Sequence, residues 1–288
     1  MVYGNVDVNL LQSEVTTATV ETILTANKVL RKLRNSPNRL YTRKIESEEL
    51  HLVAWSDASW ANRKCGSSTG GYLIGICGKE VLTGTRGHVT VASWATNKLR
   101  RVARSSMAAE VQALANAEDE LHLTRLAWAE FNGIRPDMNN VDSVIATVPG
   151  TVVIDAKSIY DTLTSTNQPL QLQEKRTALE LLAYLKNTEA NQTETRWVHG
   201  GANLADGLTK IGPHPMLREF LESGTWALVQ DPKGLSGKRR QALGLDKLSE
   251  SDLENVFQAE ENFRKLAWKK LEEVWPAFCG DSDSEQDW

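Results

Sequence analysis

Three strand-forming segments in a row, joined by short links that contain glycine, constrain the fold of this chain more than any other feature. They span residues 51–59, 69–77 and 89–94. In the first segment Trp55 and Asp57 share one face of the strand, and Ala54 and Ser56 share the other. Because links this short join antiparallel neighbours, the segments predict a three-stranded antiparallel sheet.

Downstream of these strands the pattern changes to helices alternating with strands. Helices are predicted at residues 105–131, 158–163 and 174–187 and from about residue 202, and strands at 151–154 and 193–199. Strands that are connected through helices pair in parallel. The chain therefore predicts an α/β fold: a mixed five-stranded sheet, three antiparallel strands and then two parallel ones, with helices on both faces.

Composition divides the chain into three regions. Residues 1–48 form a helical segment with a predicted helix at 14–35, and residues 49–212 form the α/β domain. Residues 213–288 form an acidic extension with helices at 217–221 and 253–275 and a disordered end at 281–288. The net charge of the whole chain is −4, but the extension carries −5 and the rest +1. The overall charge therefore says little about partners of the α/β domain.

Several classes of protein are excluded by composition and motifs. No apolar run reaches the roughly 18 residues that a membrane helix needs, and no signal peptide is present. Three cysteines without CxxC spacing indicate neither a disulfide framework nor a zinc ribbon, so we expect an intracellular protein, in the cytoplasm or the nucleus. Residues 66–70 fit the GxSxG pattern of hydrolases, but a predicted strand rather than a helix follows, which favours a hairpin turn.

Four acidic residues are the candidates for chemistry: Asp57, Glu110, Asp155 and Asp206. Asp57 and Asp155 lie in or after strands expected to be neighbours, Glu110 lies beside the apolar stripe of the long helix, and Asp206 follows a glycine-rich turn. Inward carboxylates are costly unless they are paired, and Mg²⁺ ions would supply that pairing. Taken singly, each acid also fits a structural role, as a turn residue, a surface acid, a helix cap or a partner of a helix dipole.

Six short stretches resemble, in order, landmarks of the ribonuclease H domain of copia-type LTR-retrotransposon Pol polyproteins. The stretches are SDASWA (56–61), STGGY (68–72), ASWATNK (92–98), SSMAAEV (105–111), VIDAKS (153–158) and LADGLTK (204–210). Upstream, residues 28–33 resemble the helix that joins the reverse transcriptase to this domain. The resemblance covers about residues 14–212.

This resemblance implies a ribonuclease H-like fold and hydrolysis of the RNA strand of RNA–DNA hybrids. It implies two Mg²⁺ ions, replaceable by Mn²⁺, held by the four acids Asp57, Glu110, Asp155 and Asp206. On that model Asp57 contacts both ions, Glu110 and Asp155 hold the ion near the leaving oxygen, and Asp206 holds the ion that activates water. A reverse transcriptase domain is an implied partner; the oligomeric state is not predicted.

The substrate-binding prediction rests on a basic run before the long helix. Lys98, Arg100, Arg101 and Arg104 would contact phosphates, and Ser68 and Asn97 would contact 2′-hydroxyls. A solvated loop is the alternative for the basic run. His199 lies seven residues before Asp206, where cellular relatives carry a mobile histidine loop, and a strand-end surface histidine is the alternative there.

Departures from the family pattern keep other functions open. Ala156 stands where the family has Asn, which favours a decayed or domesticated domain that binds nucleic acid without cleaving it. A further alternative is another member of the superfamily, such as an integrase or an exonuclease. Because no polymerase, protease or integrase motif is present, we expect a fragment or a truncated open reading frame.

Overall fold

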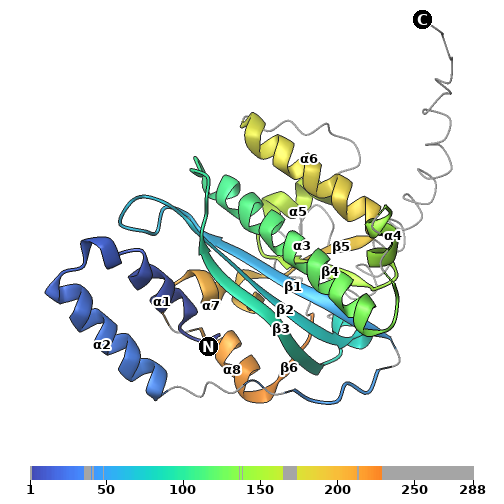
Figure 1. Cartoon of the computed structure of the whole chain (residues 1–288), viewed down its shortest axis with the longest axis horizontal. Coiled ribbons are helices and arrows are strands. Elements are labelled where there is room, and N and C mark those ends of the chain that lie inside the picture. The colour runs from blue at the N-terminus through green and yellow to red at the C-terminus, as the bar shows by residue number, and fades with distance from the viewer. Residues whose placement is uncertain are drawn as a thin grey trace, which may run out of the picture. The chain divides into compact units, whose positions relative to one another are not determined.

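The centre of the fold is a six-stranded sheet in the order β5-β4-β1-β2-β3-β6 (Figure 1). The antiparallel part consists of β1 (Leu50–Ser59), β2 (Thr69–Gly78) and β3 (Gly87–Lys98). On the other side of β1, β4 (Gly150–Ile154) and β5 (Thr193–Trp197) continue the sheet in parallel. The predicted α/β class and mixed sheet are confirmed. The strand count is six rather than five, because β6 (Thr225–Trp226), paired with the start of β3, is too short to give a periodic pattern.

This computed structural model describes residues 2–228, except 36–39, 41, 48, 136, 138, 165–173 and 213. All described residues belong to one compact unit, which spans residues 1–231. The helix predicted at 253–275 and the predicted disordered end at 281–288 lie outside the described residues. Within the described part, no helix combines the length and the apolar character that crossing a membrane requires.

One face of the sheet is covered by the helices that follow β3 and β4 (Figure 1). These are α3 (Ser106–Phe131), α4 (Val141–Ala146), α5 (Lys157–Thr164) and α6 (Lys175–Ala190). The predicted apolar stripe of α3 is confirmed, since Val111, Leu114 and Leu121 pack on Leu52 and Ile74 of the sheet. The short helix α4 was not predicted; the sequence pattern there indicates only a loop.

The opposite face is covered by helices from both ends of the described chain (Figure 1). They are α1 (Asn5–Gln12), α7 (Asp206–Thr209) and α8 (Pro215–Ser223). Trp55 lies at the centre of this core, with its ring edge-on to Trp226 at a centroid distance of 4.8 Å and 6.3 Å from the ring of Phe220. Residues that follow the predicted boundary at 212 therefore complete the core beneath β1.

The N-terminal region differs from the single helix predicted at 14–35. It contains α1, a 3₁₀ turn η1 (Val15–Thr17) and then α2 (Val20–Arg34). Thr19 caps α2, because its hydroxyl accepts a hydrogen bond from the backbone N–H of Thr22. Two further 3₁₀ turns, η2 (Lys79–Thr83) and η3 (Gly200–Ala202), lie in loops.

Gly71 determines how closely α7 approaches the sheet. Its register partners are Asp57 on β1 and Thr96 on β3. A Cβ atom at Gly71 would lie 2.9 Å from side-chain atoms of Leu208 and Thr209, closer than real Cβ contacts. On the far side, the Thr96 hydroxyl donates to the carbonyl of Leu208 at 2.7 Å. The glycine therefore makes room for one helical turn directly beside Asp57.

Candidate metal centre

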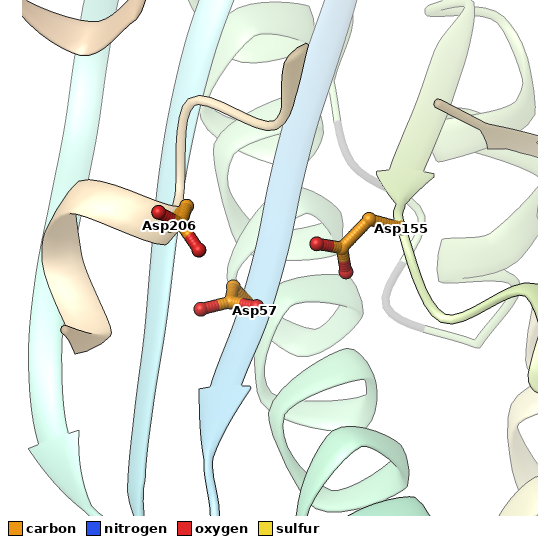
Figure 2. A group of neighbouring side chains, drawn as sticks. All are labelled: Asp57, Asp155 and Asp206. Carbon is orange, nitrogen blue, oxygen red and sulfur yellow. The ribbon is translucent and has the colours of Figure 1, made fainter. Parts of the chain in front are cut away.

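Three carboxylates from distant parts of the chain meet at one end of the sheet. Asp57 lies on β1, Asp155 directly follows β4, and Asp206 is the first residue of α7. One oxygen from each lies within 4.8 Å of the others. Figure 2 shows the Asp57 side chain lying between those of Asp206 and Asp155. The structure thus brings together three of the four predicted acids as a possible metal-binding group.

The meeting of Asp57 and Asp155 follows from strand register. β1 and β4 are parallel, and Trp55 pairs with Val153. Asp57 and Asp155 each come two residues later, so both lie on the same side and at the same level of the sheet. The prediction that these two strands are neighbours is confirmed.

Asp57 is the most deeply buried of the acids, with 1% of its surface exposed. Its Oδ2 accepts a hydrogen bond from the Thr209 hydroxyl. Its Oδ1 is buried without a hydrogen-bond donor and has only an ion-pair contact, 3.5 Å from Nζ of Lys210. Burial, reinforced by the charge of Asp155, raises the pKa of Asp57 to about 7.

Asp206 is held by two basic side chains of its own region. Lys210 donates to its Oδ1, and Nδ1 of His214 lies 3.2 Å from its Oδ2. Partial burial acts to raise the pKa of Asp206, but the hydrogen bonds from His214 and Lys210 outweigh it and leave the pKa below its usual value. Asp206 is therefore ionised at neutral pH.

Asp155 is oriented by the loop that precedes α7. Burial raises the pKa of Asp155, and a hydrogen bond from the Asn203 side chain opposes that rise. Asn203 is itself buried and also donates to the carbonyl of Ser56 at 2.8 Å, so it ties Asp155 to β1. A Cβ atom at Gly200 would lie 3.3 Å from Oδ2 of Asp155, so this loop passes close to the carboxylate.

Glu110, the fourth predicted acid, approaches from α3 on the other face of the sheet. Its carboxylate accepts a hydrogen bond from the backbone N–H of Ala58, the residue after Asp57. Burial raises the pKa of Glu110 to about 9, and the charges of Asp57 and Asp155 add to the rise. Glu110 is not one of the three converging acids, but the negative charges of two of them contribute to its raised pKa.

The donor set fits a hard divalent cation. Carboxylate oxygens are the ligands that Mg²⁺ and Mn²⁺ prefer in proteins. The buried Oδ1 of Asp57, which lacks a hydrogen-bond donor, is an atom whose burial is costly unless a cation contacts it. The three acids could therefore hold a metal ion.

The predicted substrate contacts are divided between the surface and the interior. Asn97, Lys98, Arg100 and Arg104 are exposed at the end of β3 and in the following loop, and Arg101 pairs with Glu180 of α6. β1 and β3 both run antiparallel to β2, so this loop lies at the same end of the sheet as Asp57. Ser68, in contrast, is buried.

Ser68 and His199 have local structural partners. The Ser68 hydroxyl accepts from the backbone N–H of Ala61 at 3.0 Å, and this contact stabilises the loop after β1. Exposed His199 caps η3 by accepting from the N–H of Gly201 at 3.3 Å. His199 directly precedes Gly200, whose position faces Asp155, so it lies near the edge of the centre.

Sequence reasoning missed the side chains that hold the acids: Asn203, Thr209, Lys210 and His214. Thr209 and Lys210 had a signal, because they lie three and four residues after Asp206, the spacing that shares one helix face. It also missed Trp60, which is half exposed and donates from its ring N–H to the carbonyl of Ala103 at 3.0 Å. That bond joins the loop after β1 to the basic loop before α3.

No protein-family model matches the chain. Among characterised proteins, it is similar to the retrovirus-related Pol polyprotein from transposon RE1 of Arabidopsis thaliana, with 33% identity over 145 residues. The match covers 49% of this chain and 9% of that polyprotein. The chain therefore spans less than a tenth of the length of this relative.

Solved structures similar to the chain include two ribonucleases H and a viral polymerase. RNase H1 from the halophilic archaeon Halobacterium salinarum NRC-1 has a TM-score of 0.34 and 15% identity, over 59% of this chain and 98% of that one. LC11-RNase H1 in complex with an RNA/DNA hybrid has a TM-score of 0.36 and 14% identity, over 55% and 93%. The foamy viral protease-reverse transcriptase in complex with an RNA/DNA hybrid has a TM-score of 0.32 and 14% identity, over 67% and 26%.

Proposed function

We propose that this chain is a metal-dependent endoribonuclease of copia-type retrotransposon origin that hydrolyses the RNA strand of RNA–DNA hybrids. One observation carries the proposal: Asp57, Asp155 and Asp206 converge around a buried carboxylate oxygen that has no hydrogen-bond donor. The six family-like stretches and the similarity to a transposon Pol polyprotein support the substrate class.

In this proposal Asp57, Glu110, Asp155 and Asp206 hold two Mg²⁺ ions, which Mn²⁺ can replace. Bound there, the ions would supply an activated water and stabilise the leaving oxygen of a phosphodiester. The neighbouring side chains fix the carboxylates in place: Thr209 holds Asp57, Asn203 holds Asp155, and His214 holds Asp206. Removing a side chain that hydrogen-bonds to a metal ligand typically lowers metal affinity or activity by about 10–100-fold.

The hybrid would bind along the loops at this end of the sheet. Exposed Lys98, Arg100 and Arg104 would contact phosphates, and Asn97 and half-exposed Trp60 would contact sugars and bases. Ser68 is left out of this surface because it is buried and its hydroxyl is already bonded. We also propose that residues 1–48 connect this domain to a reverse transcriptase, the partner that the resemblance implies.

The direct test replaces Asp57 by Asn and measures Mg²⁺-dependent cleavage of a labelled RNA–DNA hybrid. Because the substitution removes a charged metal ligand but keeps the size of the side chain, we expect the rate to fall by at least about 100-fold while the fold persists. Asp142→Asn, at an exposed position in the first turn of α4, is the matched control and should cleave normally.

Parallel reactions with duplex DNA and single-stranded RNA define the substrate. Cleavage of the hybrid alone is expected. Unchanged activity of Asp57→Asn would refute the assignment of the centre, and preferential cutting of duplex DNA would point to another member of the superfamily.

A second candidate function is supported by Ala156, which stands where the family carries Asn next to Asp155. Loss of an amide side chain there favours a domain that binds hybrids but no longer cleaves them. A wild-type protein that binds the hybrid in salt-dependent fashion and leaves it intact with either Mg²⁺ or Mn²⁺ would establish this alternative.

A further inference from the structure

The ammonium group of Lys210 lies inside the group of carboxylates. Lys210 directly follows α7, and its Nζ donates to Oδ1 of Asp206 and lies 3.5 Å from Oδ1 of Asp57. The latter is the buried oxygen that has no hydrogen-bond donor. A positive charge of the protein itself therefore contacts two of the acids that are proposed to hold metal.

The backbone around Lys210 is held by hydrogen bonds, whereas its side chain is partly exposed to solvent. Nε2 of His214 lies 2.7 Å from the carbonyl oxygen of Lys210, and the Lys210 N–H bonds to the carbonyl of Asp206. The side chain is 44% exposed, in contrast to 11% for His214. A lysine head on a flexible stem can swing to solvent, which the packed His214 ring cannot do.

Each of the two carboxylates has one oxygen that contacts a packed side chain and one that contacts the ammonium group of Lys210. Asp57 accepts from Thr209 on Oδ2 and faces Lys210 with Oδ1, and Asp206 faces His214 with Oδ2 and accepts from Lys210 on Oδ1. The two oxygens contacted by Lys210 are thus the ones that a cation can take over without breaking the contacts of Thr209 and His214.

We propose that Lys210 is an internal counter-cation, which neutralises Asp57 and Asp206 in the metal-free protein and is displaced when a divalent cation binds. This inference rests on the proposed function, since it assumes that the same acids hold metal. Two positive groups cannot share these oxygens at close range without strong repulsion. Lys210 would therefore compete with a metal ion for these oxygens, and it is a positioning residue rather than a metal ligand.

The experiment compares Lys210→Met with Lys79→Met in the full chain. Both variants remove one positive charge and keep the length of the side chain, but Lys79 pairs with Glu49 in an exposed salt bridge outside the centre. Mn²⁺ binding is measured by isothermal titration, and melting temperature is measured in chelator and in Mn²⁺. Neither measurement requires activity.

We expect the Mn²⁺ dissociation constant of Lys210→Met to fall by about tenfold. A larger change is not expected, because solvent partly screens the charge of the exposed Lys210 side chain. Its melting temperature in chelator should drop, and its rise on addition of Mn²⁺ should exceed that of the wild type. Lys79→Met should match the wild type in Mn²⁺ affinity, and Lys210→Arg, which keeps the charge, should bind no more tightly than the wild type.

Two results separate failure of this inference from failure of the proposed function. If the wild type binds Mn²⁺ and Lys210→Met binds with equal or lower affinity, the counter-cation role is overturned and the metal centre stands. If the folded wild type binds no Mn²⁺, the proposed function fails and this inference fails with it. Should Lys210→Met not fold in chelator, recovery of the fold in Mn²⁺ supports the role, and absence of recovery overturns it.

Discussion

The pKa values of Asp57 and Glu110 follow from where these two acids lie in the fold. Burial and mutual repulsion raise the pKa of Asp57 to about 7 and that of Glu110 to about 9, whereas His214 and Lys210 keep Asp206 ionised. Two effects reduce the negative charge where these carboxylates meet: the raised pKa values of Asp57 and Glu110, and the basic side chains beside Asp206.

A pH dependence of stability follows for the metal-free protein. The pKa values of Asp57 and Glu110 are higher in the folded chain than in the unfolded one, so the folded form binds more protons between about pH 4 and pH 9. The stability that these acids contribute is complete below about pH 4 and is lost as the pH rises through 7 and 9. We expect the melting temperature in chelator to fall across that window.

Glu110→Gln is the informative variant for this prediction, because it removes the group with the higher of the two pKa values. Its melting temperature should depend less on pH above 7 than that of the wild type. Glu130→Gln, at an exposed position near the end of the same helix, should behave as the wild type does. Parallel pH profiles of all three proteins would contradict the raised pKa of Glu110.

At the residue scale, the sequence predicted the acids but not their partners. Asp57 and Asp155 could be placed together because strand alternation and parallel pairing are regular. The contacts of Asn203 and His214 depend on the path of loops that have no periodicity, so no spacing rule indicates them. Ser68 was predicted to contact substrate, but in the structure its hydroxyl accepts a hydrogen bond from the backbone N–H of Ala61. A loop N–H needs such a partner, and no pattern in the sequence indicates it.

Among the elements, α7 has the greatest influence on the centre relative to its length. Within and just after one helical turn it presents Asp206, Thr209 and Lys210 to the same group of carboxylates. The position of α7 depends on the absence of a side chain at Gly71 of β2, which lets Leu208 and Thr209 approach the strand. The close approach of α7 to β2 therefore determines where Asp206 lies relative to Asp57.

Substituting Gly71 by Ala should separate α7 from the sheet. The new methyl group would lie 2.9 Å from Leu208 and Thr209, so one of them must move. We expect a loss of about 1–3 kcal/mol in the free energy of unfolding, typical of overpacking, and weaker Mn²⁺ binding because Thr209 no longer holds Asp57.

The control for this prediction is Gly201→Ala, where the nearest atom to the added methyl group is 3.7 Å away. Urea unfolding and Mn²⁺ titration of both variants provide the comparison. Wild-type metal affinity in Gly71→Ala would show that the close approach of α7 does not matter.

Most elements of the fold were predictable from the sequence, including the five-residue strands β4 and β5. The three antiparallel strands and α3 span ten or more residues in the structure, and their positions agree with prediction to within a few residues. The helix predicted from about residue 202 begins at Asp206 as α7, whereas α4 and β6 were not predicted, because six and two residues are too few for a period to stand out. Tertiary contacts rather than local propensity stabilise these short pieces.

On the scale of the whole molecule, the core extends past both predicted boundaries of the α/β domain. Val2 and Val6 are buried at the start, and Phe220 and Trp226 pack on Trp55 near the end of the described chain. Trp55 lies on β1 two residues before Asp57, so the packing of α8 and β6 supports the strand that carries the central acid. The division at residues 48 and 212 remains a prediction from composition.

Phe220→Ala tests how much the segment after residue 212 contributes. The side chain is almost fully buried against Trp55, so its removal should cost about 3–5 kcal/mol in the free energy of unfolding. Phe131→Ala is the matched control, because that ring is exposed at the end of α3 and should change stability by less than about 0.5 kcal/mol. Equal urea midpoints for the two variants would contradict a shared core.

The four acids are spread along the chain: Asp57 lies in β1, Glu110 in α3 and Asp206 in α7, and Asp155 directly follows β4. A polypeptide that is still emerging from the ribosome lacks the last of them until α7 has left the exit tunnel. If these acids bind metal as proposed, the site is complete only after α7 has been synthesised and folding has joined β1 to the last helices.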